Sequence, residues 1–136
     1  MAVLDVQDLK TYYRILRGTV KAVDEVSFQV EKGKATGLAG ESGCGKTTAA
    51  LSILKILPVN GEVVGGRVLF EGRDILKLDQ DEMREEIRWK RISIVFQGAM
   101  NALNPLYNVG DQITEAINLH EPDVTKQEAL ERAKKL

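Results

Sequence analysis

Residues 40–47 of this 136-residue chain are Gly-Glu-Ser-Gly-Cys-Gly-Lys-Thr, an ungapped match to the pattern G-x-x-x-x-G-K-[ST]. A run of small and apolar residues, 35–39, precedes this stretch, and a segment with a helical pattern, 46–57, follows it up to the next proline. Polyphosphate concentrates negative charge in a small volume, and glycines let the backbone wrap around it with N–H groups turned inward. Lys46 would add a positive charge for the β- and γ-phosphates, and Thr47 a hydroxyl for Mg²⁺. The stretch therefore predicts a buried strand, a phosphate-binding loop and a helix, in that order.

The loop, its cysteine and the single histidine each also have a plainer interpretation. The loop itself could be a glycine-rich turn that happens to precede Lys-Thr. Cys44 could be a thiol activated by the helix N-terminus, but a small residue that contributes only its backbone N–H is the favoured interpretation. His120 is the only histidine, and a surface position at a helix end is favoured over a metal or catalytic role.

Composition narrows the class of protein. Hydrophobic residues make up 43% and charged residues 29%, which suits a folded core and argues against disorder. The net charge of −1 argues against a nucleic-acid partner, and the single cysteine excludes an internal disulfide framework and a cysteine-based zinc site. The longest uncharged stretch, 92–110, contains amides and a proline that are costly in hydrocarbon, and no secretory signal is visible. We therefore expect a soluble chain that reaches a membrane only through a partner.

Strand patterns lie on both sides of the loop. Residues 3–13 are extended in character, and residues 22–30 alternate, with Val26, Phe28 and Val30 on one face. The expected buried core strands are 35–39 and 92–96. Gly61, Gly65 and Gly66 predict a loop, and Glu71-Gly72 predicts a hairpin after a strand at 67–70.

Helix patterns follow the loop and dominate the last third of the chain. The expected helices are 46–57, 79–90, 109–119 and 125–136. Asp79 with Glu82, and Thr125 with Glu128, have the spacing of N-terminal capping boxes. The last helix pattern ends without a stop signal, so we expect the chain to be a piece of a longer domain.

Three motifs, in the right order, resemble those of the ATP-binding cassette (ABC) transporter ATPases. Tyr13 stands where that family has the aromatic residue of its A-loop, residues 40–48 (GESGCGKTT) resemble its Walker A motif, and residues 92–97 (ISIVFQ) resemble the strand that carries its Q-loop glutamine. The similarity covers the whole chain. It implies an α/β fold: a P-loop NTPase (RecA-like) core with an N-terminal antiparallel β region and the start of an α-helical subdomain, here incomplete. Residues 1–97 would form the β region and the core up to the Q-loop, and residues 98–136 the Q-loop exit and the start of the helical subdomain.

ATP and Mg²⁺ are the cofactors that the resemblance implies. Tyr13 would stack on adenine, although it could be an ordinary strand aromatic, and a slip of one residue would exchange it with Tyr12. Gln97 would meet Mg²⁺ or its bound water and sense the γ-phosphate, the alternative being a polar residue at a strand end. Thr47 and Gln97 are therefore the implied Mg²⁺ ligands. The implied nucleotide-binding residues are Tyr13, Gly40, Glu41, Ser42, Gly43, Cys44, Gly45, Lys46, Thr47 and Thr48.

Several motifs of the family are not found in these residues. The LSGGQ-type signature loop, the Walker B strand with its catalytic glutamate, the D-loop and the switch histidine would all follow Leu136. No residue here is a candidate general base, so Lys46 and Gln97 would only assist catalysis and this chain alone is expected to be inactive. Two of the missing strands would lie between those at 35–39 and 92–96, so we expect a protein ending at Leu136 to be poorly stable or to borrow strands from another copy.

The segment after the predicted Q-loop resembles that of importers of di- and oligopeptides. Its informative parts are Ala-Leu-Asn-Pro at 102–105 and Val-Gly-x-Gln-Ile at 109–113. The resemblance implies a subunit that powers peptide import by binding and hydrolysing ATP, paired head to tail with a second ATPase subunit in a homo- or heterodimer. It would be held at the cytoplasmic face of the membrane by permease subunits that contact residues 98–119. Leu103, Leu106 and Tyr107 would serve this contact if exposed, and a core role is the alternative.

Other functions are compatible with parts of this pattern. The cargo could be nickel or an oligosaccharide, or the chain could be a nucleotide-binding module without turnover. An ABC ATPase of DNA repair or translation is a further possibility, which the segments at 103–105 and 109–113 disfavour. A small-molecule kinase of the P-loop class would not need the antiparallel region, Tyr13 or the Phe-Gln pair at 96–97.

Overall fold

A computed structural model describes residues 2–98 and 102–135. The contacts divide the chain into two compact units, one ending at Ile92 and the other beginning at Ser93, and each is described here by itself. The sequence places a boundary after Gln97 on the basis of motifs, whereas the division seen here rests on contacts. The boundary after Gln97 therefore stays a prediction.

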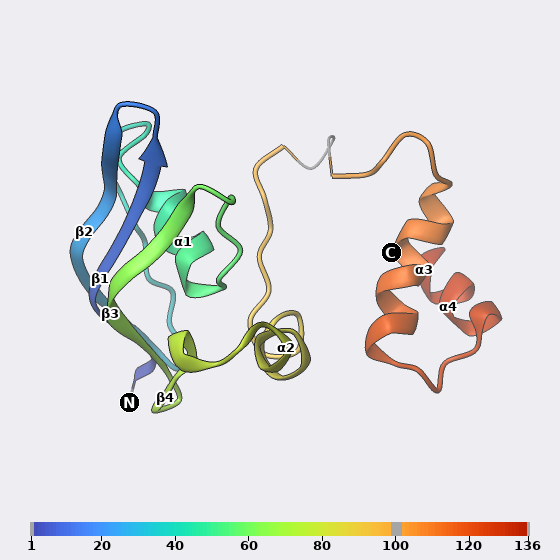
Figure 1. Ribbon diagram of the computed structural model, residues 1–136. Coiled ribbons are helices and arrows are strands. Elements are labelled where there is room, and N and C mark those ends of the chain that lie inside the picture. Colours follow the sequence, from blue (N-terminus) through green and yellow to red (C-terminus); the bar gives the residue numbers. More distant parts are fainter. Residues whose placement is uncertain (1, 99–101, 136) are drawn as a thin grey trace. The chain divides into compact units, whose positions relative to one another are not determined.

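The first unit is built on an antiparallel sheet (Figure 1). Its strands are β1 (Ala2–Ile15), β2 (Gly18–Glu31), β3 (Gly61–Phe70) and β4 (Arg73–Asp74), in the order β2-β1-β3-β4. The alternation along β2 is confirmed, since Val26, Phe28 and Val30 are half-buried and their neighbours exposed. A bulge at Glu25, whose φ is +56°, shifts the register, so that Leu9 pairs with Val26 and Thr11 with Val23. In a regular strand, Val23 and Val26 would face opposite sides because they are three residues apart. The bulge places Val23 on the buried side as well.

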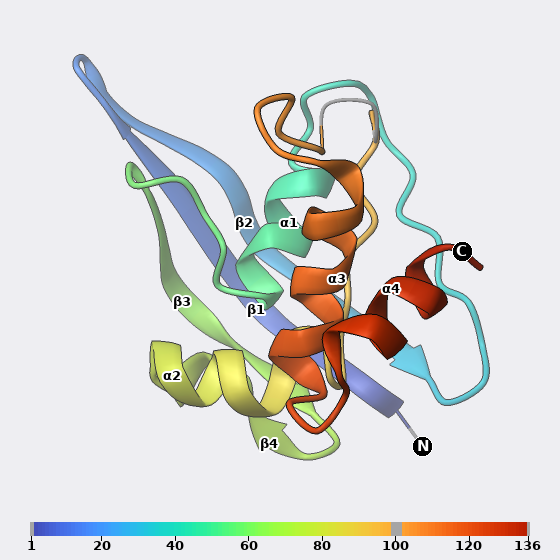
Figure 2. The same ribbon diagram turned by 90° about the vertical axis from the view of Figure 1, so that its right-hand side faces the viewer.

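Helix α1 (Lys46–Ile53) lies on one face of this sheet and closes the core (Figures 1 and 2). The buried residues that pack together are Val6, Leu9, Val23, Ala49, Ile53, Val68, Ile75, Leu78, Met83 and Ile87. Burying one large aliphatic side chain fully contributes roughly 1.5–3 kcal/mol, so this cluster dominates the stability of the unit. The helix ends before the predicted Leu57, because Lys55 takes a φ of +53° and the N–H of Ile56 bonds the carbonyl of Leu51 at 3.0 Å. That geometry closes the last turn and stops the helix.

Two predicted core strands are not formed. Residues 35–39 have no regular structure, and residues 92–96 make only an isolated bridge between Ile92 and Arg88. Val95 is 93% exposed and Leu38 45% exposed, so their apolar side chains are not packed. A strand needs a neighbour for its backbone N–H and C=O groups, and among the described residues no strand pairs with either segment.

The loop predicted at Gly61–Gly66 is also wrong, because β3 runs through it. Gly65 pairs with Lys10 in the ladder with β1, and the register shifts beside that pair. Gly66 has a φ of +91°, and a Cβ there would lie 2.5 Å from the carbonyl oxygen of Asp8. These glycines therefore allow a close backbone approach within a strand rather than a loop.

Local turn signals after β3 are confirmed. Glu71 and Gly72, with φ values of +48° and +84°, form the turn between β3 and β4. Asp79 caps the helical segment formed by α2 (Gln80–Glu82) and η2 (Met83–Ile87), and Glu82 completes the capping box. The segment ends at Ile87 instead of the predicted Lys90, because Arg88 already has an extended backbone.

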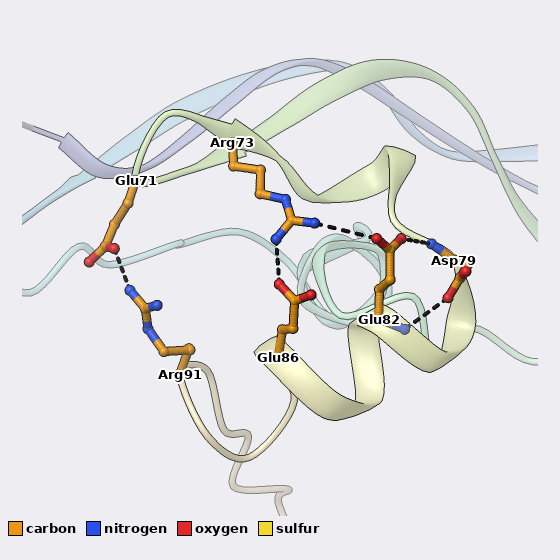
Figure 3. Close-up of polar contacts among 6 residues, drawn as sticks. All are labelled: Glu71, Arg73, Asp79, Glu82, Glu86 and Arg91. Carbon is orange, nitrogen blue, oxygen red and sulfur yellow. Dashed lines mark hydrogen bonds and ion pairs between the residues drawn. The ribbon is translucent and has the colours of Figure 1, made fainter.

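Exposed ion pairs connect the β3–β4 turn to the helical segment (Figure 3). The guanidinium of Arg73 contacts Glu82 and Glu86, and that of Arg91 contacts Glu71 and lies 5.2 Å from the centre of the Phe70 ring. Each pair is half-exposed, so solvent screening leaves it little weight of its own. They link the turn to the helical segment through Arg73 and to Arg91 through Glu71.

The second unit contains two helices, α3 (Val109–His120) and α4 (Lys126–Ala133). The capping box of Thr125 and Glu128 at the start of α4 is confirmed. The side chain of Gln112 accepts from the N–H of Asn104 and donates to the carbonyls of Asn104 and Tyr107, which ties the preceding loop to α3. Across the parts of the chain that the structure describes, no helix combines the length and the apolar character needed to cross a bilayer.

Candidate nucleotide site

The predicted phosphate loop lies exposed between β2 and α1. Gly43 and Gly45 have φ values of +81° and +96°, a conformation that glycine adopts without strain. Gly45 is the N-cap of α1, and a Cβ there would lie only 2.2 Å from the carbonyl oxygen of Ala22. Glycine is therefore required at this position, because the loop passes directly against β2.

The start of α1 is free to bind an anion. None of the described side chains caps its first turn, and that turn contains no acidic residue. The first N–H groups of a helix have no partner within the helix, and the helix dipole gives this end a partial positive charge. Thr47, in the same turn, is exposed. Amides, a dipole and a hydroxyl are thus presented to solvent together.

Lys46 crosses the loop instead of extending into solvent. Its Nζ donates to the carbonyl oxygens of Gly40 and Glu41, at 2.8 and 2.6 Å, and lies 3.4 Å from Sγ of Cys44. The ammonium is therefore held against the backbone at the start of the loop. Cys44 folds back toward Gly40, where a Cβ would lie 2.7 Å from the cysteine sulfur.

Tyr13 and Tyr12 have different surroundings. The hydroxyl of Tyr13 lies 3.3 Å from Oγ1 of Thr48 on α1, and its ring packs on Gly61, where a Cβ would lie 2.6 Å from the ring. Tyr12 instead donates to Asp24 at 2.7 Å, and this bond is the main reason why the pKa of the Asp24 carboxyl is lowered. Of the two tyrosines, the structure brings Tyr13 to the helix that follows the loop.

Gln97 belongs to the second unit, in a segment without regular structure, and its side chain is exposed. The structure therefore does not test its predicted contact with Mg²⁺. In the predicted permease-contacting segment, residues 99–101 lie outside the described residues. Leu103, Leu106 and Tyr107 are exposed, with Leu106 at 87%.

Sequence reasoning missed three side chains around α1. Thr11 and Ser52 are fully buried, and their hydroxyl oxygens lie 2.7 Å apart. Arg88 donates to the carbonyls of Leu54 and Lys55, each at 2.8 Å, at the C-terminal end of α1. Burial, with a smaller effect of the nearby charge of Arg84, lowers the pKa of Arg88. The spacing gave a signal for the hydroxyl pair. Thr11, two residues before Tyr13, falls on the same face of a strand, and Ser52, four residues after Thr48, falls on the same face of a helix.

Comparison with solved structures identifies the fold as that of an ATP-binding cassette. One similar structure is a cassette described as dimeric, in a post-hydrolysis state, bound to ADP and Pi; the TM-score is 0.77 at 20% sequence identity, over 97% of this chain and 54% of that one. The family model described as ABC transporter matches residues 23–136. The chain belongs to the ABC transporter family, which confirms the resemblance and the α/β fold class predicted from sequence.

Curated relatives share most of this chain. It is 45% identical to a probable peptide ABC transporter ATP-binding protein of Sinorhizobium fredii, over 96% of this chain and 38% of that protein. It is 39% identical to the oligopeptide transport ATP-binding protein OppD of Bacillus subtilis, over 98% of this chain and 37% of that protein. It is also 38% identical to OppD of Escherichia coli, over 97% of this chain and 38% of that protein. The chain thus spans less than two fifths of the length of these relatives.

Proposed function

We propose that this chain is the nucleotide-binding part of an ATP-binding subunit that powers peptide uptake. The observation that carries the proposal is the loop 40–45, whose glycine-dependent turn leads into the uncapped N-terminus of α1 and whose carbonyls hold the ammonium of Lys46. The names of the relatives support peptides as the cargo over nickel or an oligosaccharide.

The donor set fits Mg·ATP. Backbone amides and the ammonium of Lys46 suit the phosphate oxygens, and the hydroxyl of Thr47 is the hard oxygen ligand that Mg²⁺ prefers. Tyr13, half-buried beside Thr48, would present the remaining face of its ring to adenine. Gln97 is proposed as a further ligand of the Mg²⁺ ion or of its bound water.

Turnover would need groups that these 136 residues do not supply. The sequence contains neither an LSGGQ loop nor a Walker B strand, and no residue is a candidate to activate water. This observation favours a second candidate function for the chain by itself: nucleotide binding without hydrolysis. In an intact transporter, a second ATPase subunit would close over the nucleotide and drive the permease at the cytoplasmic face of the membrane.

The exposed segment around Leu106 and Tyr107 is proposed as part of the permease contact. Both side chains are large, apolar and exposed, so a permease that covered them would remove apolar surface from water. Asn104 and Gln112 hold the backbone of this loop, so the contact would be made on a preformed surface.

Calorimetric titration with Mg·ATP tests the proposal. Lys46→Ala should weaken binding strongly, because it removes the positive charge held over the loop, and it should abolish transport in the assembled transporter. Lys34→Ala is the matched control, since Lys34 is exposed and pairs only locally with Glu31. Equal affinities for the two variants would exclude this loop as the phosphate site.

Gln97→Ala tests the sensor role separately. It should leave Mg·ATP binding nearly intact and uncouple hydrolysis from transport. Gln29→Ala, on the exposed side of β2, is the control. Loss of Mg·ATP binding in Gln97→Ala alone would show that this glutamine binds nucleotide rather than senses it.

A further inference from the structure

A buried pair of hydroxyl groups stands out in an otherwise apolar interface. Thr11 of β1 and Ser52 of α1 are both 0% exposed, within the core that includes Leu9, Ala49 and Ile53. Replacing both partners of such a pair by apolar groups of the same shape can leave the free energy of unfolding nearly unchanged. Stability alone therefore does not explain why hydroxyls occupy these positions.

The hydrogen bonds of this pair have one possible direction. Ser52 Oγ donates its single proton to the carbonyl of Thr48, at 2.6 Å. Thr11 must then be the donor in its 2.7 Å contact with Ser52. The result is an ordered chain from Thr11 to Ser52 to the backbone of Thr48.

Thr48 is also where Tyr13 makes contact. The hydroxyl of Tyr13 lies 3.3 Å from Oγ1 of Thr48, so β1 and α1 are joined at two points, Thr11–Ser52 and Tyr13–Thr48. The spacings match: two residues along a strand span about 6.6 Å. Four residues along a helix span about 6.0 Å. Any sliding or rotation of α1 on β1 would break both contacts.

We propose that Thr11 and Ser52 are positioning residues of the nucleotide site. They lock α1, and with it Lys46, Thr47 and the free N–H groups of the first turn, at one register against the strand that carries Tyr13. The base-binding and phosphate-binding ends of the site are thereby preorganised with respect to each other, which lowers the cost of ordering them when nucleotide binds. The inference rests on the proposed nucleotide binding.

Two substitutions of Thr11 separate positioning from packing. Thr11→Val keeps the shape and removes the donor to Ser52, so it should lower the melting temperature slightly, by the effect of one net hydrogen bond. It should also raise the Kd for Mg·ATP about fivefold, because α1 is no longer held at one register against β1. Thr11→Ser keeps the hydroxyl and loses a buried methyl, so it should lower the melting temperature and leave the Kd unchanged. Thr19→Val, on the exposed end of β2, is the control and should change neither quantity.

Ser52→Ala and the double variant extend the test. Ser52→Ala leaves the buried Thr11 hydroxyl without its acceptor, so it should lower the melting temperature by about 5 °C as well as weaken binding. Thr11→Val with Ser52→Ala should recover most of that temperature and keep the weakened binding. Measurements are made on the intact protein by calorimetry with Mg·ATP and by thermal unfolding.

The outcomes are distinct. Weakened binding in Thr11→Val and in the stable double variant supports the positioning role. Wild-type affinity in both variants would overturn it and leave the pair as packing only. Failure of the wild-type protein itself to bind Mg·ATP would refute the proposed function instead.

Discussion

The two units of this chain are held together in different ways. The first, up to Ile92, has a core of fully buried side chains drawn from distant parts of the sequence, such as Leu9, Val68 and Met83. In the second, Ala129 is the one buried hydrophobic residue among those described, and the helices are set by caps and short loops. The first unit thus depends on long-range packing, and the second on signals within a few residues. This difference predicts where substitutions should be costly and where they should be mild.

The largest effect is expected where the loop crosses the sheet in the first unit. Gly45→Ala would place a Cβ 2.2 Å from the backbone of Ala22 and strain a φ of +96°. We expect a loss of on the order of 4 kcal/mol in the free energy of unfolding, measured with urea. Gly37→Ala is the control, because a Cβ at Gly37 meets no atom within 4 Å. If Gly45→Ala were as stable as Gly37→Ala, the proposed anchoring of the loop on β2 would be wrong.

The second largest effect is expected when a packed apolar residue, rather than an unpacked one, is truncated. Leu9→Ala removes a fully buried side chain and should cost about 3 kcal/mol in the free energy of unfolding. Val95→Ala, at a position 93% exposed, should change it by less than about 0.5 kcal/mol. Both variants are measured by urea unfolding under the same conditions. A large cost at Val95 would show that residues 92–96 are packed in solution.

A medium effect is expected at the C-terminal end of α1. Arg88→Met removes the donors that bond the carbonyls of Leu54 and Lys55 while keeping much of the apolar stem. The expected cost is about 1–2 kcal/mol. Arg84→Met, which loses only an exposed pair with Asp81, should cost under about 0.5 kcal/mol. Equal costs would mean that Arg88 does not hold the end of this helix.

The smallest effect is expected in the second unit, as a pH dependence of α4. Hydrogen bonds from the backbone and then the hydroxyl of Thr125 lower the pKa of Glu128, so its carboxylate is favoured in the folded state. Its stabilising contribution is complete above the ordinary Glu pKa of 4.5 and is lost as the pH falls through the lowered value. NMR shifts of the first turn of α4 should therefore show fraying in acid. Glu128→Gln should remove most of this pH dependence, and a variant that titrates like the wild type would exclude the capping box as its cause.

Much of the fold was predictable because its signals are local. The hairpin at Glu71-Gly72 and the capping boxes at Asp79 and Thr125 each depend on residues that are at most three positions apart. The two predicted strands that failed depend on partners. Residues 35–39 and 92–96 have the apolar composition of strands, but composition cannot show whether another strand lies beside them.

For the site, the sequence alone determined which residues form the loop and which chemistry they offer, because glycine freedom and the charge of lysine are properties of the residues themselves. The tertiary structure alone decided that Gly45 must pass the carbonyl of Ala22, that Lys46 bridges Gly40 and Glu41, and that Thr11 meets Ser52. These contacts join the loop or β1 to residues whose approach depends on sheet register and on how a helix packs. Register and packing are set by all the side chains of the core together, so no single motif encodes them.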